Sequence, residues 1–229
     1  NVQFNTRKQT LLKTLYSFIA ENRKMEDAGL GISIFGTTAF NMVWEKICSK
    51  VFNNQLQSRL DSIALPESLD QFRYRPDKKL IDIIEKPAWI AKDEEYTKLA
   101  KDTLIPDLIT FVQHEEGMIM VILDAKYYNL RMEKDKTLSG QPGIESVTKQ
   151  YLYQLAYQDF ADRHGIMGIR NCFILPTEQS AIINKGHVEL QMLKNLGLQN
   201  IEVRLLPTAM IYNYYLANRQ MDINCLDLG

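Results

Sequence analysis

Apolar residues recur at helical spacing in the first part of the chain. One run covers residues 11–19, and we expect it to form an N-terminal helix within residues 1–30 that leads into the core. A second run covers residues 40–51, and Thr37 or Thr38 stands where the N-cap of that helix belongs. The chain therefore opens with two predicted helices.

The middle of the chain holds apolar runs of strand length. We expect three strands there, at residues 80–90, 105–112 and 118–128. Polar, charged or proline-bearing segments separate them and predict solvated loops, at residues 61–79, 92–102 and 131–148. The pattern in this part of the chain is typical of a meander of strands.

Helices and strands alternate in the remainder. We expect helices at residues 150–162 and 188–196, and a last helix that follows Pro207 and extends to Leu216. We expect strands at residues 172–175 and 201–206. Two helices, a strand meander and then alternating elements predict an α/β fold, with a mixed β-sheet core flanked by helices.

The chain length bounds the domain organisation. A chain of 229 residues has the length of one large domain, and we treat residues 1–229 as a single domain. Because the sequence begins with Asn1 rather than Met, we expect it to be a fragment of a longer chain. The longest apolar run, at residues 118–123, is far shorter than the ~20 residues of a membrane span, so we expect no membrane contact.

Charge and cysteine content exclude two classes of protein. The 27 basic residues nearly balance the 28 acidic ones, which excludes a strongly basic nucleic-acid binder, so that any anionic partner must be held by a local patch. The three cysteines are odd in number and widely spaced, which argues against a secreted, disulfide-bonded fold and places the protein in the cytoplasm. We expect each cysteine to be a small buried apolar residue.

The most informative segment is a predicted hairpin. His114–Gly117 is a compact polar turn between two apolar strands. If these four residues form the turn, the antiparallel register places Asp107 directly opposite Asp124, with Cβ atoms ~5 Å apart on one face. Lys126 lies two residues beyond Asp124 and therefore projects from the same face.

This arrangement has two interpretations. Both carboxylates could be strand-end residues in solvent, with Lys126 neutralising them. Alternatively, because they close a strand that looks buried on both faces, they could form a site for a hard cation, since Mg²⁺ takes oxygen ligands and keeps several waters. The apolar character of residues 118–123 favours the cation site.

Pro106-Asp107, a short hairpin and Asp124-Ala125-Lys126 together resemble the signature of the PD-(D/E)XK nucleases. An acidic residue on a preceding helix, Glu45, fits the same pattern. So does a later helix that presents Gln150, Tyr153, Gln154 and Tyr157 on one face, although that face could also belong to a packing helix with polar tips. Two departures are an Asp where many relatives have Glu, and Gln154 where a Tyr is usual.

Other segments resemble the LlaJI type of restriction endonuclease, which is related to the McrC nuclease subunit. They are Phe35-Gly-Thr-Thr38, Ile84-Glu-Lys-Pro87 with Trp89, and the helix that begins near Lys149. The resemblance covers about residues 35–215 and implies a restriction-endonuclease-like fold. It also implies a Mg²⁺-dependent DNA endonuclease of a restriction system, with Mn²⁺ as a substitute.

The resemblance implies a role for each motif residue. Asp107, Asp124 and the Ala125 carbonyl would ligate the metal, and Glu45 would bind a second metal or hold a ligated water.

Lys126 would orient the attacking water and stabilise developing charge. Gln150 would position the water, the lysine or the scissile phosphate. With Glu45, Asp107 and Asp124, these two complete the expected catalytic set.

Two basic stretches are candidates for holding double-stranded DNA, although both could be solvated loops. They contain Arg73, Arg75 and Lys78 in one, and Arg131, Lys134 and Lys136 in the other. The resemblance further implies an AAA+ GTPase partner like McrB, and double-strand cleavage suggests a dimer. The alternatives are an inactive nucleic-acid-binding or assembly module of the same fold, or a nuclease that acts on RNA or branched DNA.

Overall fold

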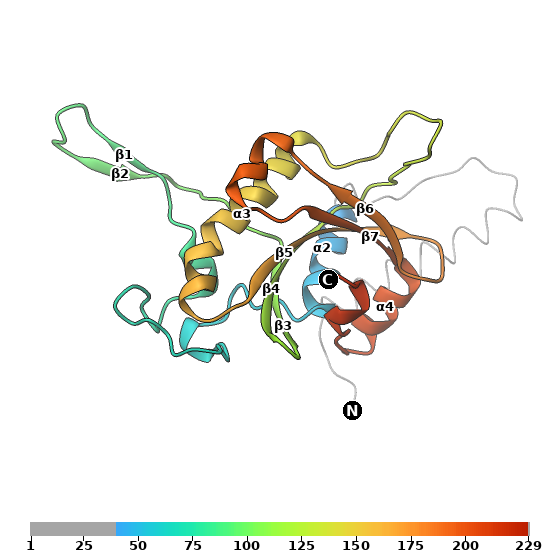
Figure 1. Cartoon of the computed structure of the whole chain (residues 1–229), viewed down its shortest axis with the longest axis horizontal. Helices are drawn as coiled ribbons and strands as arrows, with labels where there is room; N and C mark the ends of the chain where they lie inside the picture. The colour runs from blue at the N-terminus through green and yellow to red at the C-terminus, as the bar shows by residue number, and fades with distance from the viewer. Residues whose placement is uncertain (1–39, 229) are drawn as a thin grey trace, which may run out of the picture. The chain divides into compact units, whose positions relative to one another are not determined.

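The computed structural model describes residues 40–228 of the chain, except for the side chain of Lys194. The helix expected within residues 1–30 and the capping residues Thr37 and Thr38 lie outside the described residues. Figure 1 shows a central sheet with helices packed around it, and one small hairpin that projects away from it. No helix among residues 40–228 is both long and apolar enough to cross a membrane.

The core is a five-stranded mixed sheet in the order β3-β4-β5-β7-β6. Its strands are β3 (Leu108–His114), β4 (Gly117–Ala125), β5 (Gly168–Thr177), β6 (Ile183–Val188) and β7 (Ile201–Pro207). The three central strands β4, β5 and β7 run parallel, while β3 and β6 are antiparallel edges. The predicted α/β fold with a mixed sheet is confirmed, and it is consistent with a restriction-endonuclease-like fold.

Three helices cover the two faces of this sheet. They are α2 (Phe40–Val51), α3 (Ile144–Arg163) and α4 (Thr208–Leu216). Apolar residues of α2 and α4 form one core cluster with one face of the sheet, whereas those of α3 belong to two clusters that include the other face. The layers are therefore α2 and α4, then the sheet, then α3.

Strand β4, between β3 and β5, is buried along most of its length. Ile119, Val121 and Leu123 pack in the α2 cluster, and Met120 and Ile122 pack in the α3 cluster. Successive strand residues point to opposite faces, so a strand covered by helices on both sides must be apolar throughout. The prediction that this run is buried on both faces is confirmed.

Most predicted elements are present, with shifted ends. The strand expected at residues 80–90 is wrong in its first half, because Leu80–Ile83 forms the 3₁₀ turn η2 and only Ala88–Ile90 forms the strand β1. Asp82 accepts a hydrogen bond from the Lys79 N–H at 2.9 Å, and this local bond competes with an extended chain. The helix α3 begins at Ile144, within the segment expected as a loop.

The helix expected at residues 188–196 is also wrong. Val188 ends the strand β6, and Gln191–Leu196 forms only the 3₁₀ helix η3. β6 exists because it pairs antiparallel with the outer edge of β7, a contact that its own hydrophobic pattern does not reveal. The charged segment at residues 92–102 is exposed as predicted, but it contains the short strand β2 (Thr97–Leu99), which pairs with β1.

Two of the three cysteines match their prediction. Cys48 and Cys172 are buried, whereas Cys225 is exposed. Cys225 lies in the single-turn helix η4 (Ile223–Leu226), which turns Ile223 and Leu226 inward and leaves the cysteine outside. The remaining short element is the 3₁₀ turn η1 (Leu60–Ser62), which opens the loop expected at residues 61–79.

Candidate active site

The β3–β4 hairpin has the register that the sequence predicts. Its pairs extend from His114 opposite Gly117 to Leu108 opposite Leu123. The next pair in this register is Asp107 with Asp124, at the end of β4 that also carries the carboxyl ends of the parallel strands. The fold therefore brings both carboxylates to one edge of the sheet.

Three charged side chains meet at this edge. The Lys126 Nζ lies 2.8 Å from Asp124 Oδ2 and 3.8 Å from Asp107 Oδ2. The backbone N–H of Ala125 donates a hydrogen bond to Asp107 Oδ2 at 3.0 Å, which fixes the rotamer of that carboxylate. Only 8% of the Asp124 side chain is exposed, against 22% for Asp107, so the cluster lies at the mouth of a buried strand. The prediction that the side chains of Asp107, Asp124 and Lys126 lie close together is confirmed.

The cluster carries more negative than positive charge. Burial and then the Asp107 carboxylate raise the pKa of Asp124 to about 7, against the opposing effect of Lys126. Burial alone would lower the pKa of Lys126, but Asp124, Asp107 and Glu45 together raise it above its ordinary value. Three carboxylates that surround one ammonium favour the arrival of a further cation.

The donor set fits a magnesium ion. Asp124 Oδ2 is buried and accepts no hydrogen bond from the described residues, although the Lys126 ammonium lies beside it as an ion-pair partner. Among residues 40–228, no group of three or more His, Cys, Asp or Glu side chains is placed to hold a metal ion. Mg²⁺ keeps several waters, so two carboxylates with backbone carbonyl and water oxygens suit it without a third such side chain.

Helix α2 brings Glu45 toward this cluster. Trp44, Ile47, Cys48 and Val51 are buried, and the Trp44 indole N–H donates to the carbonyl of a β5 residue at 3.3 Å. These contacts leave the half-buried Glu45 on the side of the carboxylates. Burial raises the pKa of Glu45, the Asp107 carboxylate raises it further, and Lys126 opposes the change.

Sequence reasoning missed Asn54, which holds the backbone at Asp107. Its Nδ2 donates to the Asp107 carbonyl at 3.1 Å and to Ser49 Oγ at 3.0 Å. Its Oδ1 accepts from the backbone N–H groups of Leu56 and Ile109, at 2.9 and 3.1 Å. An Asn after a helix signals only a helix end, so the long-range role of this residue has no signal in the sequence.

The polar face of α3 separates into two kinds of residue. Tyr153 donates to the Ile105 carbonyl at 2.9 Å, and Gln154 accepts from Asn171 at 2.8 Å. Tyr157 also has a backbone partner, so these three residues are packing contacts, as the alternative interpretation holds. Gln150 is fully buried, yet neither of its amide atoms has a hydrogen-bond partner among the described residues.

This helix face borders the carboxylates. Burial raises the pKa of the Tyr153 hydroxyl, and the Asp124 and Asp107 carboxylates raise it further. Gln150 lies one helical turn before Tyr153, on the same face. The buried amide of Gln150 therefore belongs to the surroundings of the cluster.

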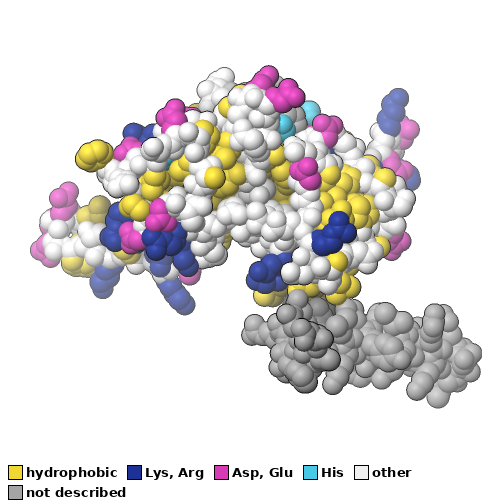
Figure 2. Space-filling view, turned by 90° about the horizontal axis from the view of Figure 1, so that it is seen from below, with side chains coloured by type: hydrophobic (Ala, Val, Ile, Leu, Met, Phe, Trp, Pro, Cys, Tyr) yellow, Lys and Arg dark blue, Asp and Glu magenta, His cyan; other side chains and the backbone are white. Residues whose placement is uncertain are grey.

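The first basic stretch is partly neutralised by acids. Arg73 lies 3.6 Å from Asp159, and Arg75 lies 2.9 Å from Asp77. With Lys78, these arginines line an open groove of about 420 Å³ beside α3. On the face shown in Figure 2, basic side chains are mixed with acidic ones and do not form a continuous basic surface.

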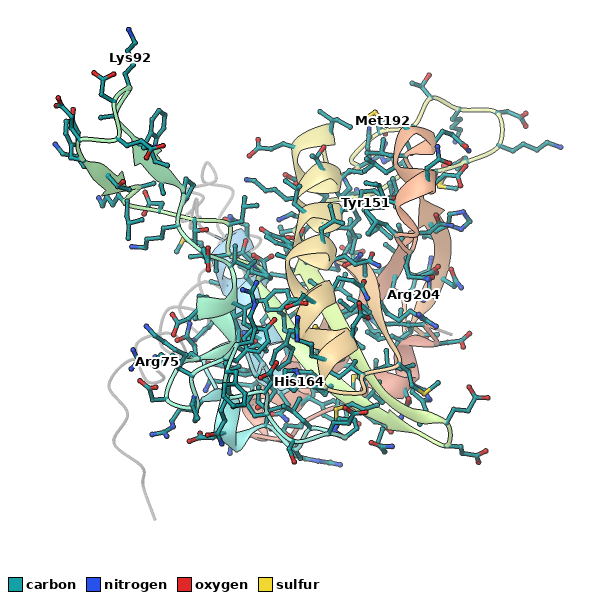
Figure 3. All side chains as sticks on the ribbon, turned by 60° about the vertical axis from the view of Figure 1, so that its left-hand side comes forward. Arg75, Lys92, Tyr151, His164, Met192 and Arg204 are labelled. Atoms are coloured by element: carbon teal, nitrogen blue, oxygen red, sulfur yellow. The ribbon has the colours of Figure 1, made fainter. Side chains whose placement is uncertain are left out.

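The second basic stretch lies in the loop between β4 and α3. Arg131 and Ser139 exchange backbone hydrogen bonds at the base of this loop, and Lys136 pairs with Glu133 at 2.6 Å. Lys134 lies between them in the sequence. Figures 1 and 3 agree in placing this loop far from the segment that carries Arg75, so the structure does not bring the two basic stretches together.

Comparisons with known proteins agree on a class. Residues 1–206 match the family described as LlaJI restriction endonuclease. Over 214 residues the chain is 28% identical to the "Type II restriction enzyme BsuMI component YdjA" of Bacillus subtilis (strain 168), covering 91% of this chain and 39% of that protein. The chain thus spans about two fifths of the length of this curated relative. No solved structure matches the present chain.

Proposed function

The chain belongs to the LlaJI restriction endonuclease family, and we propose that it is the Mg²⁺-dependent nuclease part of a restriction system that hydrolyses DNA phosphodiester bonds. The observation that supports this proposal most is the meeting of Asp107, Asp124 and Lys126 at the end of β4. The family and the relative support the restriction-system nuclease role, and the geometry supports the residues.

We assign the metal ligands to oxygen atoms at this edge of the sheet. Asp107, Asp124 and the Ala125 carbonyl would hold the ion, and Glu45 would bind a second ion or a ligated water. When bound, Mg²⁺ lowers the pKa of its water and polarises a phosphoryl oxygen. Asp124 Oδ2 is buried and has the Lys126 ammonium beside it as an ion-pair partner, so it is an oxygen that could also ligate the ion.

Lys126 supplies a fixed positive charge. Two carboxylates hold its ammonium, at 2.8 and 3.8 Å, so little rotational freedom is lost when substrate binds. Its raised pKa keeps the side chain protonated at neutral pH. The ammonium therefore donates hydrogen bonds to the attacking water or to the phosphate oxygen on which charge develops.

Gln150 offers hydrogen bonds that no other described residue uses. A buried amide without partners costs free energy unless a ligand or a water satisfies it. Its place one helical turn before Tyr153, whose hydroxyl feels the Asp124 and Asp107 carboxylates, suits a role in holding the attacking water, Lys126 or the scissile phosphate.

The decisive experiment is cleavage of a supercoiled plasmid with Mg²⁺ or Mn²⁺. Asp124→Asn and Lys126→Ala should each lower the cleavage rate at least ~100-fold, since each removes a group that acts in the transition state. Asp162→Asn, an exposed change near the other end of α3, is the matched control and should cut normally. A fully active Lys126→Ala protein would contradict the catalytic role assigned to Lys126. Offering RNA and branched DNA in the same assay would show which nucleic acid the protein cuts.

The proposal extends to partners and location. The relative is named as a component of a restriction enzyme, so we propose that this chain also works with other subunits on double-stranded DNA. An AAA+ GTPase like McrB is the subunit that the sequence resemblance implies. In this proposal the protein acts in the cytoplasm, where its DNA substrate is found.

A further inference from the structure

An open groove of about 530 Å³ lies at the carboxyl ends of the strands β5 and β7. It is lined by residues 127–130, which follow β4, by residues 176–179 at the end of β5, by Leu205 near the end of β7 and by Thr208 just beyond it. We call this feature the edge groove. In open α/β sheets, ligands bind in the crevice outside the carboxyl ends of the strands, so the position of the groove is typical of a binding site.

The edge groove lies on the same edge of the sheet as the carboxylate cluster. β4, β5 and β7 are parallel neighbours, so their carboxyl ends follow one another along this edge. Pairing of β4 with β5 continues to the Lys126 N–H, which donates to the Ile174 carbonyl at 3.0 Å, and Tyr127 is the next residue. Neighbouring strands are about 4.8 Å apart, so a substrate with a phosphate at the cluster can place an adjoining group in the groove.

Backbone contacts fix both walls of the edge groove. Thr208 Oγ1 donates to the Thr177 carbonyl at 2.9 Å, and Thr177 Oγ1 accepts from the Gln179 N–H at 3.3 Å. On the other wall, a Cβ atom on Gly140 would lie 2.0 Å from the Asn129 carbonyl oxygen, so glycine is required for this close approach. The groove is therefore built into the fold, and its volume is within the roughly 300–1,000 Å³ that small ligands occupy.

Two tyrosines supply aromatic surface to the groove. Tyr127 and Tyr128 line it and are 42% and 44% exposed. The Tyr127 ring also packs against the Phe40 ring, with 5.0 Å between the centroids, so Tyr127 has a structural role as well. Flat aromatic ligands stack on such rings, and every nucleobase has a face that can do so.

The remaining lining favours a neutral ligand. Among the described residues that line the groove, Glu178 alone is charged and none is basic. Basic groups hold phosphates, so the groove does not suit the DNA backbone. The amides of Asn129 and Gln179 each offer a donor and an acceptor, which match the hydrogen-bonding groups on the edge of a nucleobase.

We propose that the edge groove binds one unpaired nucleobase of the DNA strand whose phosphate lies at the carboxylate cluster. Inside a duplex both faces of a base are covered by its neighbours, so a tyrosine can stack on a base only after that base leaves the helix. Unstacking costs least for a base that is already unpaired. This inference rests on the proposed function and adds a substrate class to it, namely DNA that carries a base outside the helix.

The test is the affinity of the 229-residue chain for three DNA duplexes, measured by fluorescence titration. Ca²⁺, a hard cation that also takes oxygen ligands, replaces Mg²⁺ to keep the DNA uncut. One duplex carries a bulged 2-aminopurine, the second a bulged abasic nucleotide at the same place, and the third is fully paired. The wild type should bind the bulged base at least ~5-fold more tightly than either of the others, since one stacked base supplies that much affinity.

Variants of Tyr128 identify the stacking ring. Tyr128→Ala should lose the preference for the bulged base, whereas Tyr128→Phe should keep it, because the ring stacks without its hydroxyl. Stacking quenches 2-aminopurine, so the complex with Tyr128→Ala should emit more strongly than the wild-type complex. The matched control is Tyr96→Ala, which removes an exposed tyrosine from the β1–β2 hairpin and should keep the preference.

The possible outcomes separate this inference from the proposed function. Equal affinity of the wild type for the bulged and paired duplexes overturns the inference, and so does a preference that survives in Tyr128→Ala. Equal affinity for the bulged base and the abasic bulge also overturns it, because backbone flexibility would then explain the preference. A protein that prefers the bulged base but makes no metal-dependent cut in plasmid supports the groove and rejects the proposed function.

Discussion

The side-chain amide of Asn54 donates a hydrogen bond to the backbone carbonyl of Asp107, across 53 residues of sequence and a distance of 3.1 Å. This bond joins the end of helix α2 to the strand end that carries the first proposed metal ligand. Asn54 touches neither metal nor substrate, so in this proposal it is a positioning residue.

Replacing Asn54 with Asp tests this role. The variant keeps the Oδ1 acceptor for two backbone N–H groups but loses the donor to Asp107. We expect the Mg²⁺ concentration for half-maximal cleavage to rise ~10-fold or more, because residues that orient metal ligands affect metal affinity by such factors. Activity should recover in excess Mg²⁺, which a merely unfolded variant would not show.

Ser49→Ala is the control for Asn54→Asp. It removes the other acceptor of the same amide and leaves the bond to Asp107 in place. Its Mg²⁺ requirement should stay near that of the wild type. An unchanged Mg²⁺ requirement in Asn54→Asp would show that Asp107 is positioned without this bond.

Gln150→Leu should lower activity without lowering stability. The buried amide has no partner among the described residues, so removing it relieves a cost of roughly 1–3 kcal/mol and leaves the free energy of unfolding unchanged or higher. Cleavage should fall at least ~10-fold, because the water or phosphate loses its hydrogen bonds. Urea denaturation and plasmid cleavage measure the two effects.

Gln154→Leu is the matched contrast on the same helix face. Its amide oxygen accepts from Asn171 and from the Gln199 backbone N–H, so the change leaves the buried Asn171 amide without this acceptor and should cost about 1–3 kcal/mol. If Gln150→Leu destabilises the protein equally, the amide of Gln150 serves packing and not the substrate.

Mg²⁺ should stabilise the protein more as pH rises to neutrality. The pKa of Asp124 is raised to about 7 by burial and by Asp107, while an unfolded Asp titrates near 3.9. Between these values the folded metal-free state binds more protons than the unfolded state, so its stability falls as pH rises through this window. Mg²⁺ needs the deprotonated carboxylate, so its contribution grows over the same window.

The measurement is the Tm with and without Mg²⁺ from about pH 5.5 to 8. The shift caused by Mg²⁺ should increase across this range in the wild type and vanish in Asp124→Asn. A shift of equal size at every pH would place the ion on groups other than Asp124.

Lys134 should contribute to DNA affinity by contacting a phosphate, and the salt dependence of binding should reveal that contact. Its loop follows the end of β4, just beyond Lys126, and each lost phosphate contact lowers the slope of log K against log salt by about 0.9. Lys134→Ala should show this change in a fluorescence titration with duplex DNA. Lys92→Ala, at the tip of the β1–β2 hairpin in Figure 3, should leave the slope unchanged.

An unchanged slope in Lys134→Ala would remove this loop from the DNA interface. Arg75→Ala then becomes the informative variant. Its guanidinium lies 2.9 Å from Asp77, so its contribution to phosphate binding should be smaller than that of an unpaired cation.

The register of the central hairpin was predictable because it is a local property. A polar turn ending in Gly117 fixes which residues face each other, and Asp107 and Asp124 followed from counting. The long apolar run of β4 likewise predicted its burial. Elements that depend on distant partners were not predictable: β6 forms only because β7 offers an edge, and residues 188–196 have a helical pattern without an α-helix.

The candidate site divides in the same way. Asp107, Asp124 and Lys126 could be placed together from the sequence, whereas Asn54 could not, because its partner is selected by the fold. The periodicity of α3 grouped Gln150 with Tyr153 and Gln154, but only the structure distinguishes the unpaired amide from residues that pack. The β1–β2 hairpin at residues 88–99 was expected to be partly a solvated segment, and its exposed aromatic residues were not foreseen.

The order in which the site assembles follows from its place in the hairpin. Asp107, Asp124 and Lys126 belong to one β-hairpin, so they meet through contacts that are close in sequence, and such contacts form early in folding. We expect Glu45 and Gln150 to join later, when α2 and α3 dock on the sheet. An ion held by the hairpin carboxylates would thus stabilise the folding transition state, and Mg²⁺ should accelerate refolding more than it slows unfolding.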